Sequence, residues 1–256
     1  MTKQLYILTG ASRGMGAAIA EQLLQAGNTL LCISRGTHLR LADIAASTGA
    51  TTLQWALDLA EPASVAKRLG EWLESTSADE YDSATLINNA ASMPNPTPIE
   101  QADPAELQRA LRVGLEAPLF LTAAFLRATQ HWRARREGQV KVLNISSGLG
   151  RRAIASQASY CAVKAGMDHF SRSVALDQGH AKHPAHIVSL APGIVDTDMQ
   201  AQLRAGDAAS FPDHALFLQL KQEGHLDTPS VAAAKIVAYL HRADFGSTPV
   251  ADVRDA

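Results

Sequence analysis

The chain has 256 residues, of which 46% are hydrophobic and 19% charged, and its formal net charge is −2. The aliphatic content is too high for a disordered chain, and the balanced charge offers nucleic acid or anionic lipid no general attraction. With only Cys32 and Cys161, a disulfide framework and a cysteine-rich metal site are both excluded. The apolar runs are too short for a signal peptide or a membrane span, so we expect a cytoplasmic protein.

Strand-like apolar runs alternate with helical periodicity along most of the chain. Strands are expected at 5–8, 29–33, 51–56, 84–87, 140–145 and 186–190, with a last short strand within 249–253. Helices are expected from 16 to 24 and at 38–46, 61–73, 103–136, 157–178 and 229–241. This alternation predicts one α/β domain over residues 1–256, a doubly wound parallel sheet with helices on both faces.

Residues 196–225 interrupt the alternation with charges, a proline and two phenylalanines. An irregular segment after the carboxyl end of a strand in an open α/β sheet lies over the ligand crevice, so we interpret it as a substrate lid. Its larger apolar residues are candidates either for a pocket wall or for plain core, and they are Met199, Leu203, Phe211 and Phe217.

A glycine-rich turn, Thr9-Gly10-Ala11-Ser12-Arg13-Gly14-Met15-Gly16, joins the first strand to the first helix. Its three glycines let the backbone turn tightly and bring the helix N-terminus against a pyrophosphate, whose charge the free N–H groups and the helix dipole stabilise. A turn that only connects two elements is the alternative. The strand before it and the helix after it favour phosphate binding.

Three further motifs follow expected strands. They are Asn88-Asn89-Ala90-Ala91, Ser146-Ser147 followed by Tyr160-Cys161-Ala162-Val163-Lys164, and Pro192-Gly193-Ile194-Val195-Asp196-Thr197. Residues four apart share a helix face, so the Tyr160 hydroxyl and the Lys164 ammonium can point at one site. Taken singly, these motifs could be a polar turn, a turn-closing serine and a solvated Tyr–Lys pair, and Ser146 suits the turn-closing role better than Ser147.

In this order and spacing the motifs resemble the TGxxxGxG, NNAG, Ser…YxxxK and PGxVxT segments of the short-chain dehydrogenase/reductase family. The resemblance covers residues 9 to about 199 and implies a Rossmann-type NAD(P)-binding domain that acts as an oxidoreductase on a small-molecule carbonyl substrate. Finer features are most similar to sepiapterin reductases and the related bacterial benzil reductases, which reduce vicinal dicarbonyl groups with NADPH. The family also implies a homodimer formed through the helices at 103–136 and 157–178.

The resemblance assigns catalytic roles to Ser147, Tyr160 and Lys164. Hydride transfer to a carbonyl carbon builds negative charge on the oxygen, which Ser147 can hydrogen-bond and Tyr160 can protonate. A neighbouring cation favours the phenolate, so we expect Lys164 to lower the pKa of Tyr160. Lys164 would also bind the nicotinamide ribose hydroxyls, as it does in the family.

The cofactor is expected to be NADPH/NADP+ rather than NADH. The second strand ends in Ser34-Arg35 without an acidic residue, and Arg13 lies in the glycine-rich turn, so two arginines can flank a 2′-phosphate. An NAD-linked alcohol dehydrogenase is disfavoured for the same reason. The residues expected to bind the cofactor are Gly10, Ser12, Arg13, Gly14, Met15, Gly16, Ser34, Arg35, Asp58, Leu59, Asn89, Ala90, Tyr160, Lys164, Pro192, Gly193, Val195 and Thr197.

Gly114 stands where the family usually has an asparagine that kinks its helix and helps to hold a proton-relaying water. Glycine also disrupts a helix and leaves its carbonyl accessible, so we expect activity to be retained. The competing hypothesis is an NADPH-binding sensor or scaffold with weak or no turnover. Asp252 matches by position the aspartate that anchors the pterin in the sepiapterin branch, but a solvent-exposed aspartate at a strand end is the favoured interpretation.

Two clusters of basic and imidazole side chains are interpreted without a ligand. His180, His183 and His186 indicate a solvated helix end rather than a metal site, because Pro184 interrupts them, and no metal is expected. A basic group at the end of the helix predicted at 103–136 complements the helix dipole rather than binding nucleic acid, and its members are His131, Arg133, Arg135 and Arg136.

Overall fold

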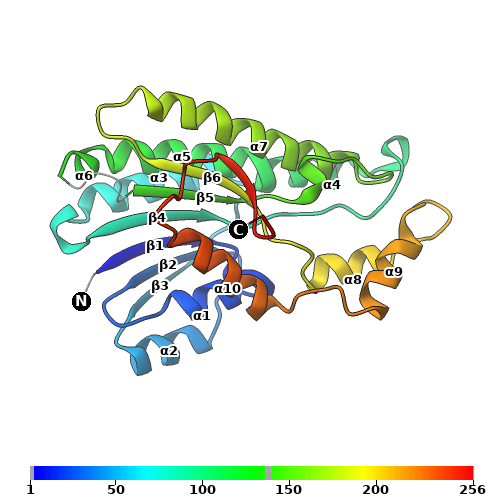
Figure 1. The fold of residues 1–256 in the computed structure, drawn as a ribbon, viewed down its shortest axis with the longest axis horizontal. Coiled ribbons are helices and arrows are strands. Elements are labelled where there is room, and N and C mark those ends of the chain that lie inside the picture. Colours follow the sequence, from blue (N-terminus) through cyan, green and yellow to red (C-terminus); the bar gives the residue numbers. More distant parts are fainter. Residues whose placement is uncertain (1–2, 136–139, 256) are drawn as a thin grey trace.

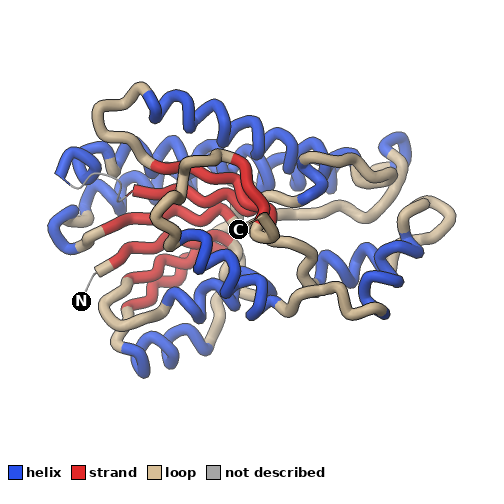
Figure 2. Tube along the Cα trace, viewed as in Figure 1, coloured by secondary structure: helices blue, strands red, loops and turns tan. Residues whose placement is uncertain are grey.

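The computed structural model describes residues 3–135 and 140–255. In this part of the chain, seven parallel strands form one sheet in the order β3-β2-β1-β4-β5-β6-β7 (Figure 1; Figure 2). The strands are β1 (Gln4–Thr9), β2 (Thr29–Ser34), β3 (Thr51–Ala56), β4 (Ser83–Asn88), β5 (Val140–Ile145), β6 (His186–Ala191) and β7 (Val250–Asp252). The predicted single α/β domain with a doubly wound parallel sheet is therefore confirmed.

Helices cover both faces of the sheet (Figure 1). One face packs on α1 (Gly14–Leu23), α2 (Arg40–Thr48) and α10 (Pro229–Leu240), and the other packs on α3 (Pro62–Ser75), α5 (Ala117–Ala128) and α7 (Ala158–Gly179). Strands covered on both faces need continuous apolar runs, and β2 is buried along its whole length. Among the described residues, no helix combines the length and the apolar character that crossing a membrane requires.

The helix predicted over 103–136 is wrong in its continuity. The structure has α4 (Pro104–Leu111), a π-helical turn at Arg112–Glu116, α5, and a short α6 (Gln130–Arg135). Pro118 explains the break, because it has no N–H to offer the carbonyl of Gly114 four residues earlier. Arg133 donates to the carbonyl of Leu126 near the end of α5, as expected of a cation at a helix end, while Arg136 lies outside the described residues.

The strand order reverses between β1 and β4, which is where open α/β sheets bind their ligands, at the carboxyl ends of the strands. The segment predicted as a lid extends beyond this edge and contains α8 (Asp198–Arg204) and α9 (His214–Gln222), at the right of Figure 1. Its two ends are joined by a parallel bridge between Val195 and Asp227. Two backbone bonds complete the joint: the N–H of Asp227 donates to Ile194 O at 2.9 Å, and the N–H of Asp196 donates to Asp227 O at 2.9 Å.

Candidate active site

The glycine-rich turn requires glycine for two reasons, the backbone conformation at Gly10 and Gly14 and the lack of space at Gly16. Gly10 has φ +72° and Gly14 has φ +56°, a left-handed conformation that favours glycine. At Gly16 a Cβ atom would lie 2.0 Å from the carbonyl oxygen of Gly10 and 2.5 Å from Nδ2 of Asn89. Only glycine at position 16 therefore allows the N-terminus of α1 to lie directly beneath this turn.

The N-terminus of α1 fits the pyrophosphate of a dinucleotide. Arg13 occupies the N-cap position without a capping side-chain hydrogen bond, and the first turn carries no acidic residue. The N–H groups of that turn and the helix dipole are thus available to an anion. The open side of Gly14 faces Thr197, whose Cγ2 would lie 3.9 Å from a Cβ at Gly14, while Ser12 and Met15 are half-buried around the turn.

Asn89 and Ala90 join the turn after β1 to the turn after β4. The Oγ1 atom of Thr9 accepts the N–H groups of both residues at 3.0 Å, and Nδ2 of Asn89 donates to the carbonyls of Thr9 at 3.0 Å and Gly10 at 3.3 Å. The Asn89 side chain therefore holds the glycine-rich turn in place across the reversal of strand order.

The ends of β2 and β3 place the residues predicted to bind the adenosine half of a cofactor. Ser34 is buried and its hydroxyl donates to Gly36 O at 2.9 Å, Arg35 is exposed, and Leu59 is buried. The carboxylate of Asp58 accepts Nη2 of Arg109, on α4, at 3.1 Å from both oxygens. Burial acts to raise the Asp58 pKa, but the N–H of Ala60 and the charges of Arg109 and Arg35 hold that pKa below its usual value.

Arg13, one of the two arginines predicted to flank a 2′-phosphate, forms an ion pair with the lid. Its Nη1 lies 2.6 Å from Oδ2 of Asp198, the first residue of α8, and both side chains are largely exposed. The turn that follows β6 leads directly to this contact. In it Pro192 and Val195 are buried and Gly193 has φ +81°, and Thr197 is the N-cap of α8. An arginine predicted to bind a 2′-phosphate is therefore held by a carboxylate of the lid.

Ser147, Tyr160 and Lys164 come together at the carboxyl end of β5. Ser147 caps a 3₁₀ turn at Gly148–Gly150, accepting the N–H of Leu149 at 3.2 Å, and its hydroxyl is near enough to Tyr160 to act on the pKa of that residue. Lys164 is 2% exposed, and its Nζ donates to the carbonyl of Ile145 at 2.7 Å. The same Nζ lies 5.7 Å from the centroid of the Tyr160 ring.

Burial has the largest effect on the pKa values of Tyr160 and Lys164. It raises the pKa of Tyr160 to about 12, against a lowering effect of Ser147, so the expected lowering by Lys164 is wrong for this structure. Burial also lowers the pKa of Lys164 to about 8, and the negative charge of Asp168 acts in the opposite direction. Tyr160 thus keeps its proton at neutral pH, while Lys164 changes charge in the mildly alkaline range.

Gly114 faces α7 with no room for a side chain. A Cβ atom at this position would lie 2.6 Å from Cγ1 of Val163, the residue before Lys164. The asparagine that the family usually has here would not fit without a change at Val163. Sequence reasoning identified Gly114 as a departure but missed its partner, because the two residues belong to different helices.

One apolar cluster adjoins Tyr160. Met93 packs with three residues of the lid, Leu203, Phe211 and Phe217, and the rings of the two phenylalanines are stacked with centroids 5.5 Å apart. The half-buried residues that pack against this cluster are Tyr160, Ile154, Met199 and Leu220. The four lid residues that the sequence left as either wall or core therefore belong to the same cluster, and that cluster contacts Tyr160.

Asp252 is buried, so its interpretation as a solvent-exposed residue is wrong. Its carboxylate accepts Nε of Arg254 at 2.8 Å and Nη2 at 2.6 Å, and Nη1 of Arg151 lies 3.8 Å away. The hydrogen bond from Arg254 is the main reason that its pKa lies below the usual value. The Asp252 carboxylate, which was predicted to be solvated, is instead buried and paired with Arg254 and Arg151.

Three charged residues near the site were missed by the sequence analysis: Arg109, Arg151 and Asp168. Each is bound to a partner far away along the chain, such as Arg109 to Asp58 or Arg151 to the carbonyl of Ala251. Such pairs leave no local pattern in the sequence. As for metals, the described residues contain no group of three or more His, Cys, Asp or Glu side chains that could hold an ion.

Comparison with known proteins places this site in a family. The short chain dehydrogenase model matches residues 4–208. Benzil reductase ((S)-benzoin forming) of Bacillus cereus is 35% identical over 239 residues, 93% of this chain and 94% of the relative. Sepiapterin reductase of Xenopus tropicalis is 31% identical over 249 residues, 92% and 90% of the two chains.

A solved structure supports the same family assignment. The crystal structure of a short-chain dehydrogenase/reductase from Burkholderia vietnamiensis is 36% identical and matches with a TM-score of 0.66, covering 99% of this chain and 98% of the other. Because the family model spans most of the chain and the relatives span nearly all of it, this chain belongs to the short-chain dehydrogenase family.

Proposed function

We propose that this protein is an NADPH-dependent reductase of vicinal dicarbonyl compounds with apolar, aromatic substituents. That it is a short-chain oxidoreductase using a nicotinamide cofactor follows from its family. The observation that carries the finer proposal is the contact between Tyr160 and the apolar cluster of the lid. A proton-donating hydroxyl at the edge of an aromatic wall suits a carbonyl flanked by aryl groups.

Asp252 supports an aromatic diketone over a pterin. A pterin would need a carboxylate free to accept its N–H groups, whereas the Asp252 carboxylate is buried and already accepts two bonds from Arg254. A pterin would therefore have to compete with the bidentate Arg254 pair for this carboxylate. The 35% identity to a benzil reductase supports the same choice.

Three side chains divide the work of the reduction. The nicotinamide of a cofactor held at the N-terminus of α1 and beside Lys164 would be the source of the hydride that the carbonyl carbon accepts. Ser147 donates a hydrogen bond to the carbonyl oxygen as negative charge builds on it, and Tyr160 transfers its proton to that oxygen. The raised pKa of Tyr160, about 12, keeps this proton in place until the oxygen becomes basic enough to accept it. The Lys164 ammonium would hold the ribose hydroxyls of the cofactor, and it offers a positive charge beside the phenol.

Arg35 supports NADPH over NADH. Arg35 follows β2 directly and is exposed, and the charge of Arg35 acts on Asp58 at the end of the neighbouring strand. A 2′-phosphate bound there would meet a guanidinium, whereas a ribose 2′-hydroxyl would find no acidic residue on β2 to accept its hydrogen bond.

The first experiment follows NADPH oxidation by the purified protein over benzil, phenyl-diones, sepiapterin and simple ketones. We expect selective turnover of the aryl diketones, and a loss of more than 100-fold in Tyr160→Phe with the NADPH dissociation constant unchanged. Tight NADPH binding without turnover of any carbonyl would favour the sensor or scaffold hypothesis. A Tyr160→Phe protein that matches the parent rate would contradict the role of Tyr160.

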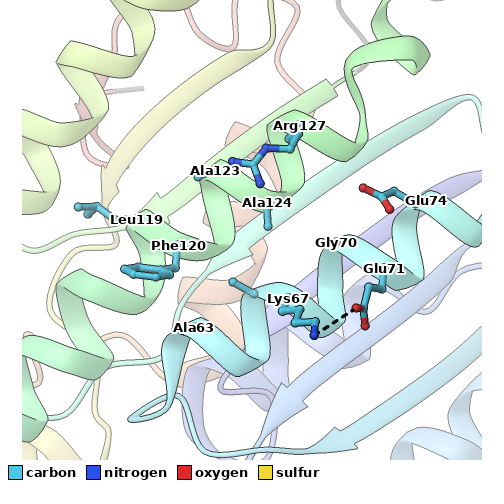
Figure 3. A pocket seen from close by; sticks show the side chains of 11 residues that line it. Ala63, Lys67, Gly70, Glu71, Glu74, Leu119, Phe120, Ala123, Ala124 and Arg127 are labelled. Atoms are coloured by element: carbon cyan, nitrogen blue, oxygen red, sulfur yellow. Dashed lines mark ion pairs between the residues drawn. The ribbon is translucent and has the colours of Figure 1, made fainter.

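We also propose a homodimer formed through α5 and α7. Leu119 and Phe120 on α5 and Leu176 on α7 are exposed. Leu119 and Phe120 also line a groove of about 620 Å³ between α3 and α5, and none of the predicted site residues lines it (Figure 3). The test is the molar mass in solution by light scattering. The parent should have the mass of two chains and Leu176→Glu the mass of one, and a parent with the mass of one chain would contradict the proposal.

A further inference from the structure

Asp168 is a buried carboxylate to which the reaction described above gives no role. It lies on α7 one turn beyond Lys164, and the residue is 1% exposed. Its Oδ1 accepts the hydroxyl of Ser146 at 2.6 Å and the hydroxyl of Ser189 at 2.7 Å, and its Oδ2 accepts Nε of Arg151 at 3.2 Å. Burying a carboxylate is unfavourable unless such partners satisfy it, so this is a fully built site rather than an incidental contact.

The partners of Asp168 lie on both sides of Ser147. Ser146 precedes it, and Arg151 follows the 3₁₀ turn at Gly148–Gly150. That turn also packs closely against α7, because a Cβ atom at Gly150 would lie 2.9 Å from the carbonyl oxygen of Lys164 and 3.2 Å from Oδ2 of Asp168. One carboxylate therefore fastens both ends of the Ser147 segment to the helix that carries Tyr160 and Lys164.

Arg151 extends this connection to β7. Its Nη2 donates to the carbonyl of Ala251 at 2.7 Å, and its Nη1 lies 3.8 Å from Oδ2 of Asp252. The Arg151 guanidinium thus contacts two carboxylates, Asp168 and Asp252. Asp252 is also paired with Arg254. The Asp168 carboxylate thus has a cationic partner in addition to the two hydroxyl groups, as a buried acceptor needs.

We infer that Asp168 is a positioning residue for the reduction: it sets the place of the Ser147 hydroxyl relative to Tyr160 by holding Ser146 and Arg151 on either side of it. This inference rests on the proposed reductase function. A displacement of a reacting group by about 1 Å can lower turnover on the order of 100-fold without a change in binding. Loosening the Ser147 segment should therefore lower kcat more than it affects KM.

Ser189 provides a matched control. Its hydroxyl donates to the same oxygen of Asp168 as Ser146 does and is equally buried, but Ser189 belongs to β6 and not to the Ser147 segment. Ser146→Ala and Ser189→Ala thus remove the same kind of bond from the same acceptor. Only the first of the two frees the segment that carries Ser147.

The experiment compares Asp168→Asn, Ser146→Ala, Arg151→Gln and Ser189→Ala by benzil reduction and by hydrogen exchange of the amides at 147–151. We expect kcat to fall about tenfold or more in Asp168→Asn and several-fold in Ser146→Ala and Arg151→Gln, with KM and the NADPH dissociation constant within about twofold. The same three variants should show faster exchange at these amides. Ser189→Ala should retain the parental kcat and exchange.

Each outcome separates this inference from the proposed function. An active parent whose kcat is unchanged in Ser146→Ala and Arg151→Gln overturns the inference, as does a Ser189→Ala protein that loses as much kcat as Ser146→Ala. A parent that reduces no carbonyl contradicts the proposed function, and faster exchange confined to the three variants would still support the positioning role. If Asp168→Asn fails to fold, the two single-bond variants decide the question.

Discussion

Gly114 and Val163 occupy one space between the π-helical turn and α7, with Cγ1 of Val163 standing 2.6 Å from where a Cβ of residue 114 would be. The two residues are a matched pair, because the absence of a side chain at one position is filled by the branched side chain at the other. Val163 is 1% exposed and directly precedes Lys164. The pair therefore sets how closely the turn approaches the lysine of the site.

Restoring asparagine at position 114 alone should be harmful. Gly114→Asn is expected to destabilise the fold by about 1–3 kcal/mol and to lower turnover, since the new side chain must displace Val163. Adding Val163→Ala should recover most of both losses. The measurement is a double-mutant cycle on thermal unfolding and kcat, and strictly additive effects of the two substitutions would show that the residues do not share this space.

Cofactor affinity should weaken on the alkaline side with an apparent pKa of about 8. Burial lowers the pKa of Lys164 to that value from 10.5, so its ammonium is present below about pH 8 and is lost as the pH rises through it. The NADPH dissociation constant, followed by fluorescence against pH, should rise through this range. Tyr160→Phe should show the same limb, because the pKa of Tyr160 is raised to about 12.

Lys164→Arg is the control for this assignment. Its guanidinium stays charged throughout the range, so its NADPH affinity should not change near pH 8. A limb that survives in Lys164→Arg would have to be assigned to a different group.

The contact between Arg13 and Asp198 should limit the preference for NADPH. Releasing Arg13 by Asp198→Asn should tighten NADPH binding by up to about fivefold, the range of an exposed ion pair, and leave NADH binding unchanged. Arg13→Ala should weaken NADPH alone, and adding Asp198→Asn to it should have no further effect. Equal changes for NADPH and NADH, measured by titration calorimetry, would contradict a role for Arg13 at the 2′-phosphate.

The lid should distinguish large diketones from small ones. Met199 packs against the apolar cluster beside Tyr160, whereas Leu218 on α9 is exposed. Met199→Ala should lower kcat/KM for benzil about tenfold more than for butanedione, because only the larger substrate reaches the wall. Leu218→Ala is the control, and a similar loss of benzil reduction in that variant would argue against this wall as the substrate contact.

The sheet could be predicted from the sequence because its strands are covered on both faces. Such strands read as unbroken apolar runs, as in Leu30 to Ile33 of β2, and the intervening helices show clear periodicity. The break at Arg112–Glu116 was missed although Pro118 was visible, because amphipathic spacing continues through it. The lid helices α8 and α9 were missed because they are short and pack on one another rather than on the sheet.

The site was predictable only where its residues lie in compact motifs. The glycine-rich turn and the Tyr160–Lys164 spacing are local, and the resemblance carries Ser147 with them. The supporting charges are not local: Arg109 pairs with Asp58 from 51 positions away, and Arg151 reaches Ala251 across 100 positions. The acidity of Tyr160 also depends on burial by the lid and the helix, which spacing along the chain does not reveal.

The bridge between Val195 and Asp227 joins the two ends of the lid to each other. Inside that joint, Asp196 accepts Arg204 of α8 and Lys221 of α9, so both lid helices are fastened to the same residue. The insertion is therefore closed at its base, and it also contacts loops and the N-cap of α1: Asp198 with Arg13, Gln202 with Asn95, and Ser210 with Ser156. A lid exchanged at Val195 and Asp227 would carry its own substrate wall to the hydroxyl of Tyr160, provided that the exchanged lid keeps partners for Arg13, Asn95 and Ser156.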